Sequence, residues 1–113
     1  MGIKHRLASL HFPRSLEARA WQSPASNRAT VIMYHEVLPD SVEIPYWSIV
    51  KESAFRRQMD YLRTHYEVLP LDDSLNRMYS REAARPGARP VAVVTFDDGY
   101  SGNFTCALPI MRD

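Results

Sequence analysis

The sequence predicts an α/β protein organised around one buried parallel strand. Residues 91–96 read Val-Ala-Val-Val-Thr-Phe, a continuous apolar run that is typical of a strand covered on both faces of a parallel sheet. Two further strand-like segments, 30–34 and 66–69, are each followed later in the chain by a segment with helical spacing of apolar residues. This alternation of strand and helix indicates the α/β class.

The composition limits the possible classes of protein. The chain has 113 residues, of which 45% are hydrophobic and 24% charged, as expected for one small globular domain. A net charge of +1 predicts no strong attraction to nucleic acid or to an anionic membrane. The single cysteine, Cys106, excludes an internal disulfide. Neither a membrane-spanning apolar run nor a signal peptide is recognisable, so a cytoplasmic location is the default expectation and an extracytoplasmic one stays open.

The chain divides at about residue 28. Residues 1–28 mix basic, apolar and small residues, are interrupted by Pro13 and end in a linker-like Ser-Pro-Ala-Ser-Asn stretch. We interpret them as a leader whose order the sequence does not define, and we expect no metal role for His5 or His11. Residues 29–113 form the predicted domain.

The first elements of this domain end in a histidine and a loop. Residues 30–34 are β-branched and apolar, as in a strand, and His35 follows at the C-terminal end. His35 either belongs to a site at that edge of the sheet or is simply packed at the end of the strand. We favour the first interpretation and consider a metal-ligating role for His35 less favoured. Residues 38–50, with Pro39 and Pro45, are predicted to form a loop.

A helix is predicted next, with Ser53 as the expected N-cap. Phe55, Met59 and Leu62 form its apolar stripe, and it is expected to end near His65.

A short strand, 66–69, is closed by Pro70. A second helix is predicted after it, with Asp72 or Asp73 as the expected cap. The apolar side of this helix carries Leu75, Met78 and Tyr79. Residues 81–90 are predicted to form a loop.

Two carboxylates follow the buried strand directly. Asp97 and Asp98 leave it at the C-terminal edge, where ligands bind in α/β folds. Their side chains point in different directions, so one could hold a metal while the other faces a reacting group. Gly99 lets the chain turn with positive φ. A plain turn without chemistry is the alternative, because Asp and Gly are common turn residues.

A last helix is predicted after residues 101–103. Phe104, Ala107, Leu108 and Met111 give it an apolar side, and Cys106 is expected to be a packed small residue. Pro109 has to lie in a first turn or at a kink.

The string Thr-Phe-Asp-Asp-Gly-Tyr at 95–100 resembles the first motif of the polysaccharide deacetylases, the NodB-homology domain of carbohydrate esterase family 4. Residues 33–37, Met-Tyr-His-Glu-Val, are similar to the opening strand of many members. The resemblance extends from about residue 30 to 113. It implies a distorted (β/α) barrel, of which this chain would be an incomplete N-terminal portion, since such barrels need about 250 residues.

The resemblance also implies an activity and roles for four residues. The activity is metal-dependent hydrolysis of N-acetyl or O-acetyl groups on a carbohydrate. Asp97 would be the catalytic base, and Asp98 would be a ligand of a divalent metal, with zinc as the expected ion. His35 and Tyr100 would contact the substrate. Tyr46 and Trp47 could stack on a sugar ring, although covering the barrel wall is the favoured interpretation.

Part of the implied site is missing from the sequence. The family's His-(Ser/Thr)-x-x-His ligand pair is absent, because the four histidines stand at positions 5, 11, 35 and 65. A catalytic zinc usually takes three protein ligands, so we expect this chain to be inactive alone. Its end within a predicted helix favours truncation. The alternative is a non-catalytic fragment or a partner-binding module derived from this fold.

Overall fold

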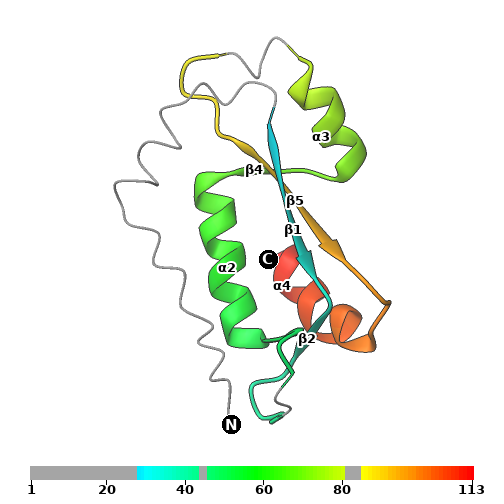
Figure 1. Cartoon of the computed structure of the whole chain (residues 1–113). Helices are drawn as coiled ribbons and strands as arrows, with labels where there is room; N and C mark the ends of the chain where they lie inside the picture. Colours follow the sequence, from blue (N-terminus) through cyan, green and yellow to red (C-terminus); the bar gives the residue numbers. More distant parts are fainter. Residues whose placement is uncertain (1–27, 44–45, 81–84) are drawn as a thin grey trace, which may run out of the picture.

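A three-stranded parallel sheet forms the centre of the protein (Figure 1). The structure is a computed structural model that describes residues 28–43, 46–80 and 85–113. Strand β5 (Val91–Phe96) lies between β1 (Ala29–Tyr34) and β4 (Glu67–Val68), and both neighbours run parallel to it. The predicted α/β class and the central place of strand 91–96 are therefore confirmed. The predicted leader, residues 1–28, lies outside the described residues except for Arg28.

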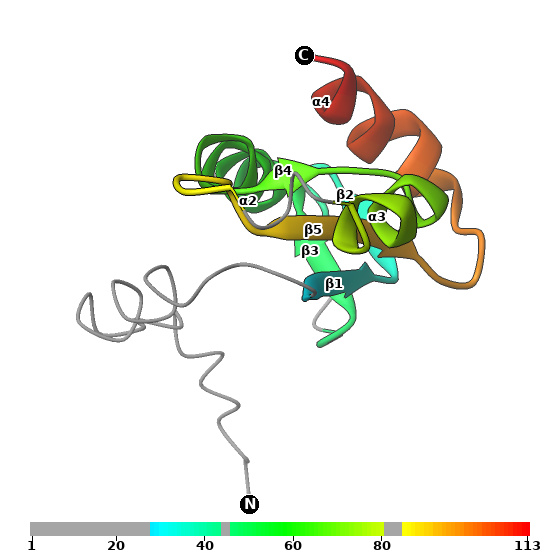
Figure 2. The ribbon, with the colours of Figure 1, turned by 90° about the horizontal axis from the view of Figure 1, so that it is seen from above.

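The helices are α2 (Glu52–His65), α3 (Leu71–Met78), the π-helical segment η2 (Asn103–Ala107) and α4 (Leu108–Arg112). Helix α2 and the η2–α4 segment pack on the same face of β1 and β5, and α3 lies at the other end of the sheet from β2 (Figures 1 and 2). No helix in the described part of the chain is long and apolar enough to cross a membrane.

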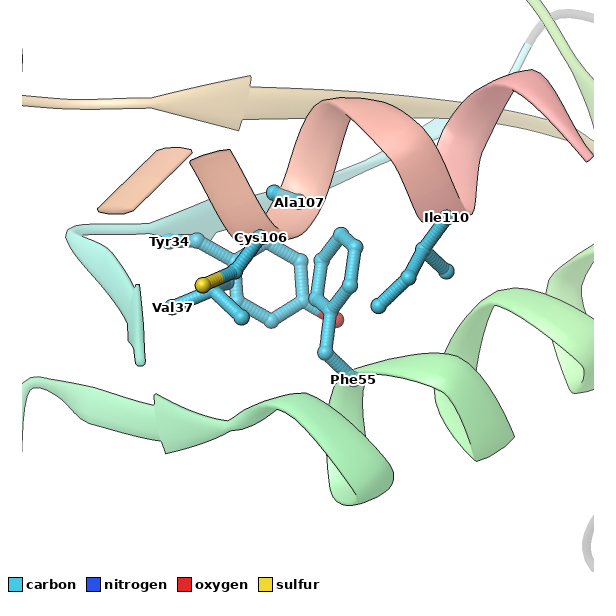
Figure 3. Close-up of a cluster of buried hydrophobic side chains, with 6 residues drawn as sticks. All are labelled: Tyr34, Val37, Phe55, Cys106, Ala107 and Ile110. Carbon is cyan, nitrogen blue, oxygen red and sulfur yellow. The ribbon is translucent and has the colours of Figure 1, made fainter. Parts of the chain in front are cut away.

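Phe55 lies at the centre of the hydrophobic core (Figure 3). Its ring is fully buried and meets the ring of Tyr34 edge-on at a centroid distance of 5.0 Å, with Phe96 at 6.0 Å. Cys106 is buried in the same cluster, as predicted for a packed small residue. The cluster joins β1, α2 and the last helix, with its members listed in chain order as Tyr34, Val37, Phe55, Cys106, Ala107 and Ile110.

The predicted loop 38–50 is partly wrong, because two short strands lie at its ends. Strand β2 (Glu36–Leu38) and strand β3 (Ile49–Lys51) pair in parallel, with Val37 opposite Val50. Each has three residues, which is too short to produce a clear alternating or continuous apolar pattern, and the two prolines between them dominate the local sequence signal.

Both predicted helix caps are also wrong by a few residues. Helix α2 begins at Glu52, and the Ser53 hydroxyl donates to Asp40 Oδ1 at 2.9 Å instead of capping the helix. Helix α3 begins directly after Pro70, so Asp72 and Asp73 lie inside its first turn. Two carboxylates there still favour the helix, because its N-terminus carries a partial positive charge.

The apolar side predicted for α3 is only partly buried, with Met78 half-buried and the other two residues exposed. Leu75 is 48% exposed and Tyr79, which caps the helix, is 82% exposed. The buried position is Ser74, and the half-buried Arg77 donates from Nε to Glu67 of β4 at 2.8 Å. The inward side of α3 therefore carries Ser74 and Arg77.

The last helix contains a wide turn before Pro109. The Leu108 N–H donates to the Asn103 carbonyl, five residues earlier, and Pro109 occupies the first turn of α4. The predicted place for Pro109 is thus confirmed, and the π segment accommodates a residue that cannot donate and whose ring would strike the preceding turn. At Gly102 the helix approaches β2 so closely that a Cβ would strike the Val37 carbonyl oxygen.

The stability of the fold should depend on pH through Tyr34. Burial raises the pKa of Tyr34 to about 12 from an ordinary value of 10.0. Because the folded state favours the neutral phenol, this contribution to stability is fully present below pH 10 and is lost as the pH rises through about 12. We expect urea unfolding of the wild type to show a fall in unfolding free energy across that range that Tyr34→Phe does not show.

The same variant loses the hydrogen bond that the Tyr34 hydroxyl donates to Gln58 Oε1 at 2.7 Å. That loss of about 1 kcal/mol is present at every pH below 10. The slope above pH 10 is therefore the informative quantity, and equal slopes for the two proteins would contradict the assignment to Tyr34.

Candidate functional site

The register of the sheet brings His35 and Asp97 to the same edge. Tyr34 pairs with Phe96 at the last position of β1 and β5, so the next residue of each strand leaves the sheet at the same level. The Asp97 N–H donates to the Tyr34 carbonyl at 2.8 Å. The backbone of Asp97 is therefore fixed by β1, independently of what its carboxylate does.

Asp98 and Gly99 turn the chain sharply after the strand. Gly99 has φ 62°, which confirms the predicted positive φ, and Asp98 also has a positive φ of 66°. This left-handed conformation is uncommon outside glycine, although aspartate tolerates it better than most residues. The turn places Asp98 Oδ2 3.9 Å from His35 Nε2, too long for a hydrogen bond but close for two charged or polar groups.

Asn103 anchors this edge and was missed in the sequence. Its Nδ2 donates to the His35 carbonyl at 2.7 Å, and its Oδ1 accepts from the Val37 N–H at 3.2 Å. The Asn103 carboxamide thus bonds to the backbone on both sides of Glu36, as a neighbouring strand would. The available signal for this role was an asparagine at the start of a helix just after an acidic turn. Asparagine is disfavoured in helix interiors, and its side chain often bonds to backbone groups.

We expect Asn103→Ala to lower the free energy of unfolding by about 1–3 kcal/mol, because two half-buried backbone groups lose their partner. The structure also predicts a local effect, namely faster amide hydrogen exchange at Val37 than in the wild type. Hydrogen exchange measured by NMR checks this, with Asn76→Ala on an exposed face of α3 as the control. Unchanged exchange at Val37 would argue against the bridging role.

One aromatic side chain lies beside His35 at this edge, and two others lie nearby in the sequence. Trp47 lies edge-on to His35 with 5.6 Å between ring centroids. Tyr46 and Trp47 are 67% and 74% exposed among the described residues, and their covering of a barrel wall stays a prediction. Tyr100 is 47% exposed, and its carbonyl accepts from the Asn103 N–H at 3.1 Å.

The side chains at this edge fit part of a metal site. Asp98 supplies a carboxylate oxygen, and His35 Nε2 lies 3.9 Å from it. Within residues 28–43, 46–80 and 85–113, no group of three or more His, Cys, Asp or Glu side chains converges as a metal site would require. A catalytic zinc with three protein ligands would need further donors.

Solved structures of two deacetylases share this fold. A de-N-acetylase from Aggregatibacter actinomycetemcomitans matches 74% of the chain with a TM-score of 0.57 and 19% sequence identity. The Streptococcus pyogenes deacetylase PplD, solved in complex with acetate, matches 74% of the chain with the same TM-score and 24% identity. No protein-family model matches the chain, and no curated protein matches its sequence.

The chain therefore has a polysaccharide deacetylase-like fold, with two carboxylates at the C-terminal end of its central strand. It spans about a third of the length of the solved deacetylases, 33% of one and 37% of the other.

Proposed function

We propose that this chain forms the first part of a metal-dependent polysaccharide deacetylase with a distorted (β/α) barrel. The reaction is hydrolysis of an N-acetyl or O-acetyl group on a carbohydrate. The observation that carries the proposal is the pair Asp97 and Asp98 at the end of β5, beside His35, in a fold shared with two deacetylases. Carbohydrate is the proposed partner, and a cytoplasmic location stays a prediction.

The two carboxylates have different geometries and receive different roles. Asp97 is half-buried with its backbone tied to β1, which suits a general base that takes a proton from the attacking water. Asp98 is exposed and turned toward His35, which suits a metal ligand. His35 and Tyr100 are the proposed contacts to the saccharide.

A divalent metal held in part by Asp98 would supply the chemistry that these side chains lack. A bound divalent ion lowers the pKa of water and polarises a carbonyl oxygen, and zinc is the proposed ion. Because the described residues provide an incomplete donor set, no reaction step through the metal follows from this chain.

The test begins with the DNA. If the reading frame continues past codon 113 into His-(Ser/Thr)-x-x-His, the product of the full frame should release acetate from N-acetylated oligosaccharides, and a chelator should abolish the release. The 113-residue chain alone should release negligible acetate. A stop codon directly after Asp113, or a full-frame product without metal-dependent acetate release, would contradict the proposal.

A second candidate is a non-catalytic module that pairs with a partner through its sheet edge. It is favoured by the open side of β1, which has one neighbouring strand among the described residues. Val31 and Met33 on this strand are 56% and 54% exposed. Unpaired edges with exposed apolar side chains favour association. This candidate expects a stop codon after Asp113 and a concentration-dependent oligomer in light scattering.

A further inference from the structure

Trp47 is presented to solvent by a fixed turn. The Ile49 N–H donates to the Tyr46 carbonyl at 3.2 Å and closes the turn around Trp47. Strand β3 follows at once and pairs with β2, so the turn is attached to the sheet structure. The side chain is nevertheless 74% exposed. A large indole held in this way has apolar surface that a ligand could cover.

Trp47 also lies beside the candidate catalytic edge. Its ring is 5.6 Å from that of His35, and His35 Nε2 is 3.9 Å from Asp98 Oδ2. His35 is thus a neighbour of both Trp47 and Asp98, and these three side chains form a row. His35 follows the C-terminal end of β1, which lies near β2 and away from α3 (Figure 1).

We propose that Trp47 binds a sugar unit by stacking, next to the unit whose acetyl group reaches Asp97. This inference rests on the proposed function and adds a substrate-binding position that specifies an oligosaccharide. A pyranose ring has an apolar C–H face and a rim of hydroxyl groups. The electron-rich indole matches that face, while an imidazole and carboxylates can donate to or accept from the hydroxyls.

The row of polar groups favours a saccharide over a protein partner. A stable protein interface needs a broad surface with an apolar centre that is depleted of charge. Beside Trp47 lies instead the imidazole of His35, and beside that imidazole lies the carboxylate of Asp98. Because His35 is a neighbour of both the indole and Asp98, the unit stacked on Trp47 and the unit that carries the acetyl group can be two adjoining sugars. The site should therefore prefer oligosaccharides to the corresponding monosaccharide.

Calorimetric titration with a β-1,4-linked N-acetylglucosamine tetrasaccharide tests the inference. The product of the full reading frame carries Asp97→Asn in all proteins compared, so that the probe is not consumed. Trp47→Ala should weaken binding about tenfold, and Trp47→Phe should retain part of the affinity. The control is Tyr79→Ala, which removes an 82% exposed aromatic ring from α3 at the other end of the sheet and should leave the affinity unchanged.

The outcomes separate this inference from the proposed function. Equal affinities for Trp47→Ala and the parent protein, or no binding of the tetrasaccharide by the parent, would overturn the role of Trp47. If binding depends on Trp47 but the protein with Asp97 intact releases no acetate, the saccharide site stands and the deacetylase function fails. If acetate release depends on Asp97 but its KM is unchanged in Trp47→Ala, the function stands and the inference fails.

Discussion

Replacing Asp97 by asparagine should lower kcat/KM for acetate release about 10²–10⁴-fold in the product of the full reading frame, the range expected when a general base is removed. Asparagine has nearly the same shape but cannot take a proton from water. The Asp97 backbone N–H bonds to the Tyr34 carbonyl and is unaffected by the change. The melting temperature should therefore stay within a few degrees of the wild type, so the loss of rate reports chemistry and not unfolding.

Two controls make this prediction specific. Asp72→Asn changes one member of the chain's other Asp-Asp pair, which lies in the first turn of α3, and should leave the rate unchanged. Asp98→Asn should also reduce the rate, but higher metal concentration should restore part of it, because the change weakens metal binding. A rate for Asp97→Asn within tenfold of the wild type would remove Asp97 from the role of base.

The position of the Asp pair could be predicted because its signals are local. A continuous apolar run ending in Asp-Asp-Gly defines a buried strand and its end, and the structure has β5 there, flanked on both sides by parallel strands. The positive φ of Gly99 is a local property as well. The catalytic and metal-binding roles of Asp97 and Asp98 stay predictions, because no observation of the described residues tests them.

The shared edge of His35 and Asp97 was predicted and is confirmed, because each residue directly follows a strand of the sheet. The side-chain contacts around the pair could not be predicted, because they depend on register and on how the helices dock. The bridge from Asn103 to the backbone of His35 and Val37 likewise joins segments that meet after the helix docks. The partial exposure of the apolar side of α3 was missed for a similar reason, since periodicity identifies an apolar side but not the surface that it meets.

Phe55→Ala should produce the largest loss of stability among the substitutions considered, about 3–5 kcal/mol in the free energy of unfolding. Phe55 is fully buried and lies between β1, β5 and the last helix, with the rings of Tyr34 and Phe96 as neighbours (Figure 3). Truncation removes its apolar contacts and leaves a cavity that the surrounding strands can fill only in part. Since small domains are stable by about 5–15 kcal/mol in total, much of the population should unfold well below the wild-type denaturant midpoint.

Phe104→Ala is the matched control, because it makes the same substitution at a residue that is 73% exposed. Its cost should stay within about 0.5 kcal/mol. Urea unfolding followed by circular dichroism compares the three proteins at equal concentration. If both substitutions cost the same, Phe55 is not the centre of the packing. A large loss for Phe55 alone would confirm it as the centre of the packing. The candidate site also rests on this cluster, since Tyr34 packs on Phe55 and its carbonyl accepts from the backbone N–H of Asp97.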